Sequence, residues 1–157
     1  MSNIRKQYEK VVAGNRYDLS KAGEHTMSII YSGIKANKMP ETERMYVEAN
    51  HVGCCLHYSM YLVSLLHEAG IECYFTITPE EDGGNHCSVL YFNEKGDKVI
   101  ADPVMDIKAG TVDKHMCIPY NEFVENAIRH EISHYDVFGI NGEEAFFNEF
   151  LSNCKLQ

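Results

Sequence analysis

Three residues of this 157-residue chain have types and an order along the sequence that suit nucleophilic catalysis: Cys55, His86 and Asp102. A nucleophilic thiol needs a lowered pKa, and a helix N-terminus lowers it through unpaired N–H groups and the positive end of the helix dipole. The thiol also needs a base within hydrogen-bond reach and a third group that orients the base. Cys55 is the candidate nucleophile, with His86 as candidate base and Asp102 as candidate orienter.

The elements expected around these residues are able to bring them together. Gly53 precedes an apolar segment at 54–67 that predicts a helix with Cys55 at its start. Residues 71–78, 86–92 and 98–101 predict three strands in a meander. The start of the middle strand lies beside the end of its antiparallel neighbour, which places His86 next to Asp102. If the helix N-terminus lies at that edge, the three side chains meet in one cleft.

The rest of the chain predicts mainly helices, so the expected class is a single α+β domain over 1–157. Helices are expected at 2–13, at 18–37, from Pro40 to Val47, and at 120–135. A last helix is expected to begin at Asn141 as N-cap, with Glu144 returning the bond. Asp102 and Pro103 are expected to end the third strand, and 105–119 to be irregular or a short strand.

Composition excludes several classes of protein. A hydrophobic fraction of 45% and a charged fraction of 24% exclude whole-chain disorder. The net charge of -9, with no basic patch, argues against a nucleic-acid partner. No run of 18 apolar residues and no Sec-type signal is present, so we expect no membrane partner and a cytoplasmic location, with non-Sec export left open. The six cysteines include no CxxC pair, so we expect reduced thiols rather than a structural zinc site.

The motifs at these three positions resemble the transglutaminase-like superfamily, within the papain-like cysteine fold, over about residues 46–104. The resemblance implies a helix bearing the cysteine packed on a short antiparallel sheet, with extra flanking helices, and no metal or organic cofactor. It implies Cys55 as nucleophile, His86 as general base and Asp102 as its orienter. Cys87 and Ser88 depart from the residues that usually follow the histidine. The matching segments are Gly53-Cys54-Cys55-Leu56-His57-Tyr58-Ser59, Asn85-His86 and Ala101-Asp102-Pro103.

Such a triad forms an acyl-enzyme on an amide or ester carbonyl. The expected reaction is hydrolysis of a peptide or side-chain amide, as in a protease or deamidase, with protein transamidation next, on a protein or peptide substrate. An oxyanion donor is also required, and the Cys55 N–H plus Tyr46, Asn50 or His51 are candidates. Cys54 is interpreted as a small buried residue that fills space.

Two alternative functions remain open. Residues 130–134 fit HExxH, in which His130 and His134 bind zinc and Glu131 activates water, as in a zinc metallohydrolase. The apolar stripe of the predicted helix leaves both histidines toward its solvent edge, which favours a surface role. The second alternative is a catalytically silent binding module of the same fold.

Overall fold

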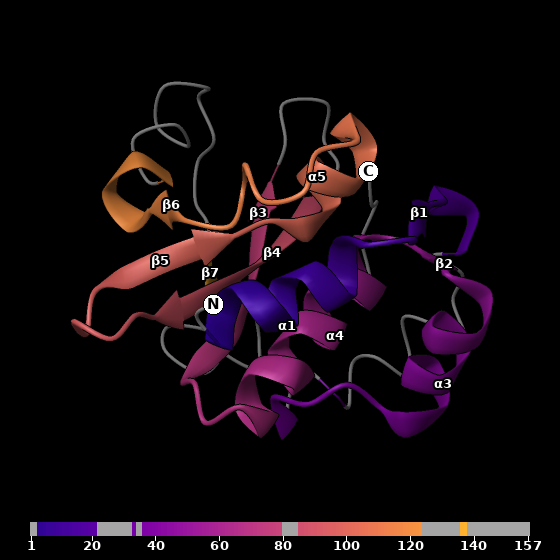
Figure 1. Cartoon of the computed structure of the whole chain (residues 1–157), viewed down its shortest axis with the longest axis horizontal. Coiled ribbons are helices and arrows are strands. Elements are labelled where there is room, and N and C mark those ends of the chain that lie inside the picture. Colours follow the sequence, from indigo (N-terminus) through magenta and orange to yellow (C-terminus); the bar gives the residue numbers. More distant parts are fainter. Residues whose placement is uncertain (1–2, 22–32, 34–35, 80–84, 124–135, 138–157) are drawn as a thin grey trace.

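The computed structural model describes residues 3–21, 33, 36–79, 85–123 and 136–137. Its centre is a five-stranded sheet in the order β6-β5-β4-β3-β7, and every pair in it is antiparallel (Figure 1). Strands β3 to β6 are consecutive neighbours, so they form a meander, and β7 returns to lie beside β3. The strands are β3 (Cys73–Pro79), β4 (Asn85–Phe92), β5 (Lys98–Ala101), β6 (Ile118–Pro119) and β7 (Asp136–Val137).

Helix α4 (Cys55–Glu68) is the core of the described structure. It contacts β3 and β4 on one side and α1 (Asn3–Val12) on the other, with α3 (Glu41–Asn50) beside it (Figure 1). Every residue from Cys55 to Leu66 is buried. A helix surrounded in this way needs mostly apolar residues on all faces, and its buried residues are apolar except for His57, Ser59 and Ser64.

A second, smaller sheet lies at the N-terminal end of α4. Strand β1 (Arg16–Tyr17) pairs in parallel with β2 (Val52–Gly53), in the register Arg16↔Val52 and Tyr17↔Gly53. The N–H of Asp18 donates to the carbonyl of Gly53 at 2.8 Å. This ladder holds Tyr17 beside the first turn of α4, and it is followed by the short 3-10 helix η1 (Leu19–Lys21).

The two faces of the large sheet are packed separately. Cys87, Val89 and Tyr91 of β4 belong to the same buried cluster as α4. The alternate residue Leu90 belongs to a second cluster with Ile100. This alternation is the period of two that a strand imposes on its side chains.

The α+β class expected from the sequence is confirmed, as are the strand at 98–101 and the helices at α1, α3 and α4 within two or three residues at each end. The expectation of irregular or short-strand structure over 105–119 is wrong for residues 105–109, which belong to helix α5 (Pro103–Ala109), and is confirmed for residues 110–119, which end in the short strand β6. Asp102 is the N-cap of α5 and Pro103 its first residue, a pair that starts a helix as well as ending a strand.

Several expected elements lie mostly outside the described residues. Of the expected helix at 18–37, the structure describes η1, the helical residues 33 and 36, and Asn37. Of that at 120–135, residues 120–123 are helical and the remainder is not described. The helix expected from Asn141 is not described either. In the part of the chain that the structure describes, no helix is both long and apolar enough to cross a membrane.

Candidate active site

His86 and Asp102 form a hydrogen-bonded pair at one edge of the sheet. His86 Nε2 lies 2.6 Å from Asp102 Oδ2. His86 is the second residue of β4, and Asp102 directly follows β5, whose last residue Ala101 pairs with Val89. The meander therefore produces the adjacency that the sequence analysis expects. The side chain of His86 is 18% exposed and that of Asp102 is 6% exposed, so solvent reaches the histidine rather than the carboxylate.

Asp102 is held in place from several directions. Its Oδ1 accepts the N–H of Met105 at 3.3 Å, which caps α5. Its own N–H donates to the carbonyl of His115 at 2.8 Å, and its carbonyl accepts the hydroxyl of Tyr8 at 3.0 Å. A carboxylate fixed at both its backbone and its side chain is able to fix the orientation of the imidazole bound to it.

Cys55 is the first residue of α4, and its side chain is fully buried. Its thiol lies near those of Cys54 and Cys87, which act on its pKa, and Cys87 follows His86 in β4. The candidate nucleophile therefore lies against β4 at Cys87, and because side chains alternate along a strand, this contact does not itself bring the imidazole of His86 to the sulfur.

The pKa of Cys55 differs from the expectation. A hydrogen bond from Cys54 lowers it, but the contact with Cys87 and burial raise it more, and the net pKa is well above the ordinary thiol value. The expectation of a lowered pKa from the helix N-terminus is therefore wrong for this state, because the contact with Cys87 and then the removal of the sulfur from water outweigh the influences that lower the pKa. Cys55 is a neutral thiol here.

Tyr17 packs near the start of α4, and its hydroxyl lies close enough to the Cys55 thiol for the two to interact. Its ring packs partly buried against the cluster that contains Cys55, and Lys108 Nζ of α5 lies 4.1 Å from the ring centre. Burial, followed by the neighbouring thiols of Cys55, Cys54 and Cys87, raises the pKa of the Tyr17 hydroxyl above its usual range. Sequence analysis missed this residue, because a two-residue parallel ladder has no local sequence pattern.

Two of the three candidate oxyanion side chains, those of Asn50 and Tyr46, have other contacts among the described residues, and His51 is exposed. Asn50 Nδ2 donates to the carbonyl of Tyr46 at 2.9 Å within α3. The ring of Tyr46 lies 6.3 Å from that of His57. His51 is exposed in the left-handed region, φ 56°, where it caps the C-terminus of α3. These contacts give no support to an oxyanion role, which stays a prediction for all three.

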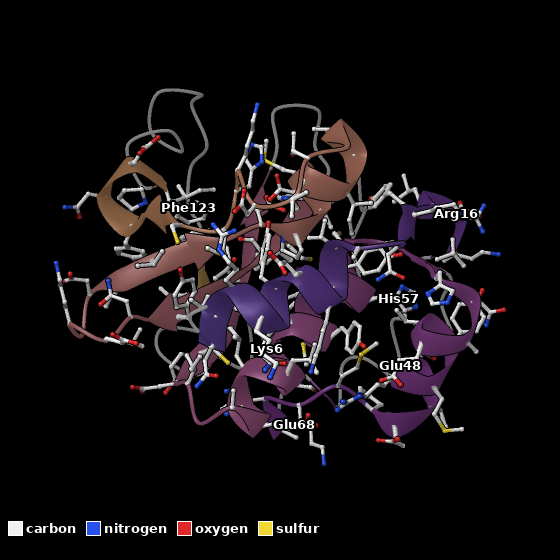
Figure 2. The ribbon with its side chains drawn as sticks, in the orientation of Figure 1. Lys6, Arg16, Glu48, His57, Glu68 and Phe123 are labelled. Carbon is white, nitrogen blue, oxygen red and sulfur yellow. The ribbon has the colours of Figure 1, made fainter. Side chains whose placement is uncertain are left out.

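A second cysteine–histidine–carboxylate line, which sequence analysis did not predict, lies beside the first. His57 Nδ1 is 3.1 Å from the N–H nitrogen of Cys54 and 3.3 Å from its Sγ, and His57 Nε2 is 3.1 Å from Glu43 Oε2. Cys54 is therefore not merely a filler of space. The sequence feature that could have predicted this contact is the spacing from Cys54 to His57, which are the N-cap and N3 residues of a capping box. Figure 2 shows His57 near α3, the helix that carries Glu43.

The alternative zinc motif is not described: His130, Glu131 and His134 lie outside the described residues, as does the acidic loop at 80–84. Within the described ranges, no group of three or more histidine, cysteine or acidic residues is arranged to hold a metal ion.

An open cavity of about 1030 Å³ lies at the other end of the β4–β5 hairpin, lined by residues that include Ile4, Tyr91, Lys98 and Tyr120. His86 and Tyr91 are five residues apart on β4, roughly 17 Å along an extended strand. The cavity is therefore separate from the His86–Asp102 pair.

Comparison of the chain with profiles of known protein families and with curated proteins finds no match.

Proposed function

We propose that this chain is a cysteine-dependent acyl-transfer enzyme with Cys55 as nucleophile, His86 as general base and Asp102 as the orienting carboxylate. The observation that carries the proposal is the His86–Asp102 pair at 2.6 Å, at one edge of the sheet on which α4 packs with Cys55 as its first residue. Helix α4, packed on an antiparallel sheet with Cys55 at its first position, is also the arrangement that a papain-like, transglutaminase-like fold requires.

The chemistry follows from the roles of the three side chains. Because Asp102 binds Nε2 of His86, Nδ1 is the nitrogen that exchanges a proton with the thiol. The sulfur of Cys55 gives its proton to His86 and bonds to the carbonyl carbon of the substrate. The imidazolium then protonates the leaving amine or alcohol as the carbon–heteroatom bond breaks. Water resolves the thioester in hydrolysis, and an amine resolves it in transamidation.

The N-terminus of α4 also offers a hydrogen-bond donor for the reaction. The N–H groups of a first helical turn have no partner within the helix, and that of Cys55 is among them. In this proposal it donates to the oxygen of the tetrahedral intermediate. The substrate class is a peptide or a side-chain amide of a protein, with hydrolysis ahead of transamidation.

The buried, neutral thiol defines the resting state of this enzyme. Proton transfer to His86 accompanies the attack rather than preceding it, because the raised pKa of Cys55 disfavours a standing thiolate–imidazolium pair.

The test uses p-nitrophenyl acetate, a small activated ester. The wild-type chain is expected to release a burst of p-nitrophenolate and to carry one acetyl group, located on Cys55 by peptide mass spectrometry. Cys55→Ser and His86→Ala are expected to lose the burst. Cys73→Ser is the matched control, because Cys73 is another buried thiol, one that bonds the carbonyl of Val63 away from this site. Acetylation that spares Cys55, or a burst unchanged in His86→Ala, would refute the proposal.

A folded wild-type chain that shows no burst and no acetylation of Cys55 favours the silent binding module. Loss of turnover with a chelator and its recovery with zinc, both unaffected by Cys55→Ser, favours the metallohydrolase. Each result is read on protein with an unchanged thermal unfolding midpoint.

A further inference from the structure

Both backbone polar groups of Asp102 are held by residues that a second carboxylate also holds. The Asp102 carbonyl accepts the hydroxyl of Tyr8 in α1 at 3.0 Å, and its N–H donates to the carbonyl of His115 at 2.8 Å. The Tyr8 hydroxyl also donates to Oδ2 of Asp106, and the N–H of His115 donates to the same oxygen at 2.9 Å. Asp106 lies one turn after Asp102 in α5 and is fully buried. The four residues therefore form a closed hydrogen-bonded arrangement.

We propose that the hydroxyl of Tyr8 is a positioning group for catalysis, which fixes the backbone of Asp102 and thereby holds its carboxylate on Nε2 of His86. This inference rests on the proposed function, because it assigns a role at the same His86–Asp102 pair. Tyr8 is fully buried, so it acts through Asp102 and does not touch the substrate.

The sequence limits the ways in which the backbone at Asp102 can be held. Pro103 has no N–H, so the peptide group between Asp102 and Pro103 can be held by hydrogen bonds only through the Asp102 carbonyl. Asp102 has φ −125° and ψ 85°, which is just outside the strand region and far from the helical one. Its conformation at the junction of β5 and α5 therefore depends on contacts from elsewhere in the chain, and Tyr8 supplies one of them.

The position of the carboxylate follows from that of the backbone. Oδ2 of Asp102 lies 2.6 Å from Nε2 of His86, and Oδ1 accepts the N–H of Met105 at 3.3 Å. Only two torsions, χ1 and χ2, separate an aspartate carboxylate from its backbone, so a rotation of the backbone displaces both oxygens. A contact that fixes the Asp102 carbonyl therefore also fixes the oxygen that binds His86.

Tyr8 is itself fixed in the core. It is fully buried, and its ring belongs to the same cluster as α4. The hydroxyl has one proton, which is shared between the Asp102 carbonyl and Oδ2 of Asp106. Burial, followed by the hydrogen bond to Asp106, raises the pKa of this hydroxyl above its usual range, so the proton stays on Tyr8. Helix α1 thus presents a permanent donor to the residue that orients His86.

A merely structural role for Tyr8 would act through Asp106 alone, and a second hydroxyl separates the two roles. Thr111 also donates its hydroxyl to Asp106. Among the described contacts, only the Tyr8 hydroxyl is bonded to Asp102 as well. Thr111→Val is therefore the matched control for Tyr8→Phe. Each variant deletes one hydroxyl from Asp106, and only Tyr8→Phe deletes a contact of Asp102.

Both variants are expected to fold. Tyr8→Phe keeps the buried ring, and Thr111→Val keeps the branched shape of the side chain. In each variant, Asp106 retains the other hydroxyl, the N–H groups of Lys114 and His115, and the His115 ring. Cooperative thermal unfolding of each variant is the condition for the comparison.

The first measurement is the proton NMR signal of the hydrogen between His86 Nε2 and Asp102 Oδ2, assigned by its absence from His86→Ala. A hydrogen bond of 2.6 Å to a carboxylate is short and charge-assisted, so its proton is expected to resonate downfield. We expect Tyr8→Phe to move the signal upfield and Thr111→Val to leave it in place. This readout needs no substrate and no reactive cysteine.

The second measurement is the burst with p-nitrophenyl acetate. We expect Tyr8→Phe to slow the burst at saturating ester by about tenfold, as a small misplacement of a catalytic group does. The ester concentration that gives half the maximal rate should not change, because Tyr8 does not touch the substrate. Thr111→Val should keep the wild-type rate.

A proton signal that Tyr8→Phe leaves in place would overturn the inference, and so would an equal shift in Thr111→Val. A burst of unchanged rate in Tyr8→Phe would also overturn it. A wild-type chain without a burst refutes the proposed function, and the NMR comparison then decides alone whether Tyr8 positions Asp102 on His86.

Discussion

Asp102 binds His86 with one carboxylate oxygen and caps helix α5 with the other. The two contacts use different oxygens, so neither competes with the other. The orientation of the imidazole is thereby tied to the start of a helix, and a change at Asp102 affects both.

Asp102→Asn separates these two roles, because asparagine offers one acceptor oxygen where aspartate offers two. We expect a burst with p-nitrophenyl acetate slowed by about a hundredfold. The free energy of unfolding should fall by about 1 kcal/mol, the size of a lost cap. Stopped-flow absorbance and urea titration measure the two effects. A variant with full burst rate would show that the pair does not orient His86 for catalysis.

Asp106 is a second buried carboxylate, with a structural role. It is fully buried and accepts the hydroxyls of Tyr8 and Thr111, the N–H groups of Lys114 and His115, and a ring contact from His115. Burial raises its pKa, but these hydrogen bonds lower it more, and the net pKa is below the ordinary value.

A lowered pKa in the folded state means that the contribution of Asp106 to stability is present above the unfolded pKa of about 3.9 and is lost as the pH falls through the folded pKa. We expect Asp106→Asn to lose about 3 kcal/mol at pH 7 and much less near pH 2. Urea titration at both pH values measures this. A penalty that stays constant with pH would contradict the role given to the charge.

The sequence predicts the elements whose periodicity is local and misses the contacts made through tertiary structure. The strand Lys98–Ala101 and the adjacency of His86 and Asp102 follow from alternation and from meander geometry. Helix α5 was not predicted because an Asp-Pro pair is compatible with two structures. It can end a strand, or it can begin a helix with Asp102 as the N-cap and Pro103 as the first residue.

The surroundings of Cys55 also depend on tertiary contacts that local sequence does not predict. A helix N-terminus is visible in the sequence, but its effect on a thiol depends on what removes the sulfur from water. Cys87 of β4 contacts the thiol and raises its pKa beside the effect of burial, and Tyr17 of β1 packs against the buried cluster to which the thiol belongs. Neither contact has a sequence signal, and together with Cys54 they decide the state of the thiol.

Alkaline pH is expected to destabilise the fold steeply. Burial is the largest cause of a raised pKa for Tyr8, Tyr58 and Tyr91, and it raises the pKa of Cys73 to about 12. Groups with a raised folded pKa contribute stability that is full below the unfolded values, about 8.5 for thiols and about 10 for tyrosines, and that is lost above them.

The urea midpoint should therefore fall between pH 8 and pH 11, with Cys73→Ala showing a shallower fall than the wild type. Circular dichroism at each pH measures it. A midpoint that does not change over this range would mean that these groups ionise as readily in the folded chain as in the unfolded one.

Gly53 is expected to tolerate no side chain. In Gly53→Ala the new methyl group meets His57, so we expect a loss of about 2 kcal/mol from overpacking. Gly14→Ala is the comparison, because its Cβ meets no atom within 4 Å and its cost comes from a φ of 73° alone. Thermal unfolding of the two variants is the measurement. The steric argument fails if Gly53→Ala is no less stable than Gly14→Ala.

Tyr17 is expected to limit access to Cys55, so its removal should make the thiol easier to reach. Tyr17→Ala takes away a ring that packs on the cluster containing Cys55, and we expect Cys55 to be alkylated by iodoacetamide at least about tenfold faster, the effect of some 1.4 kcal/mol in local opening. Tyr17→Phe keeps the ring and its contact with Lys108, so it should leave access nearly unchanged while removing the hydroxyl. Cys73 serves as the internal standard in the same digest, because global unfolding would accelerate both thiols and loss of the cover accelerates Cys55 alone. A parallel rise at both cysteines would show that the ring stabilises the fold as a whole and does not act as a cover.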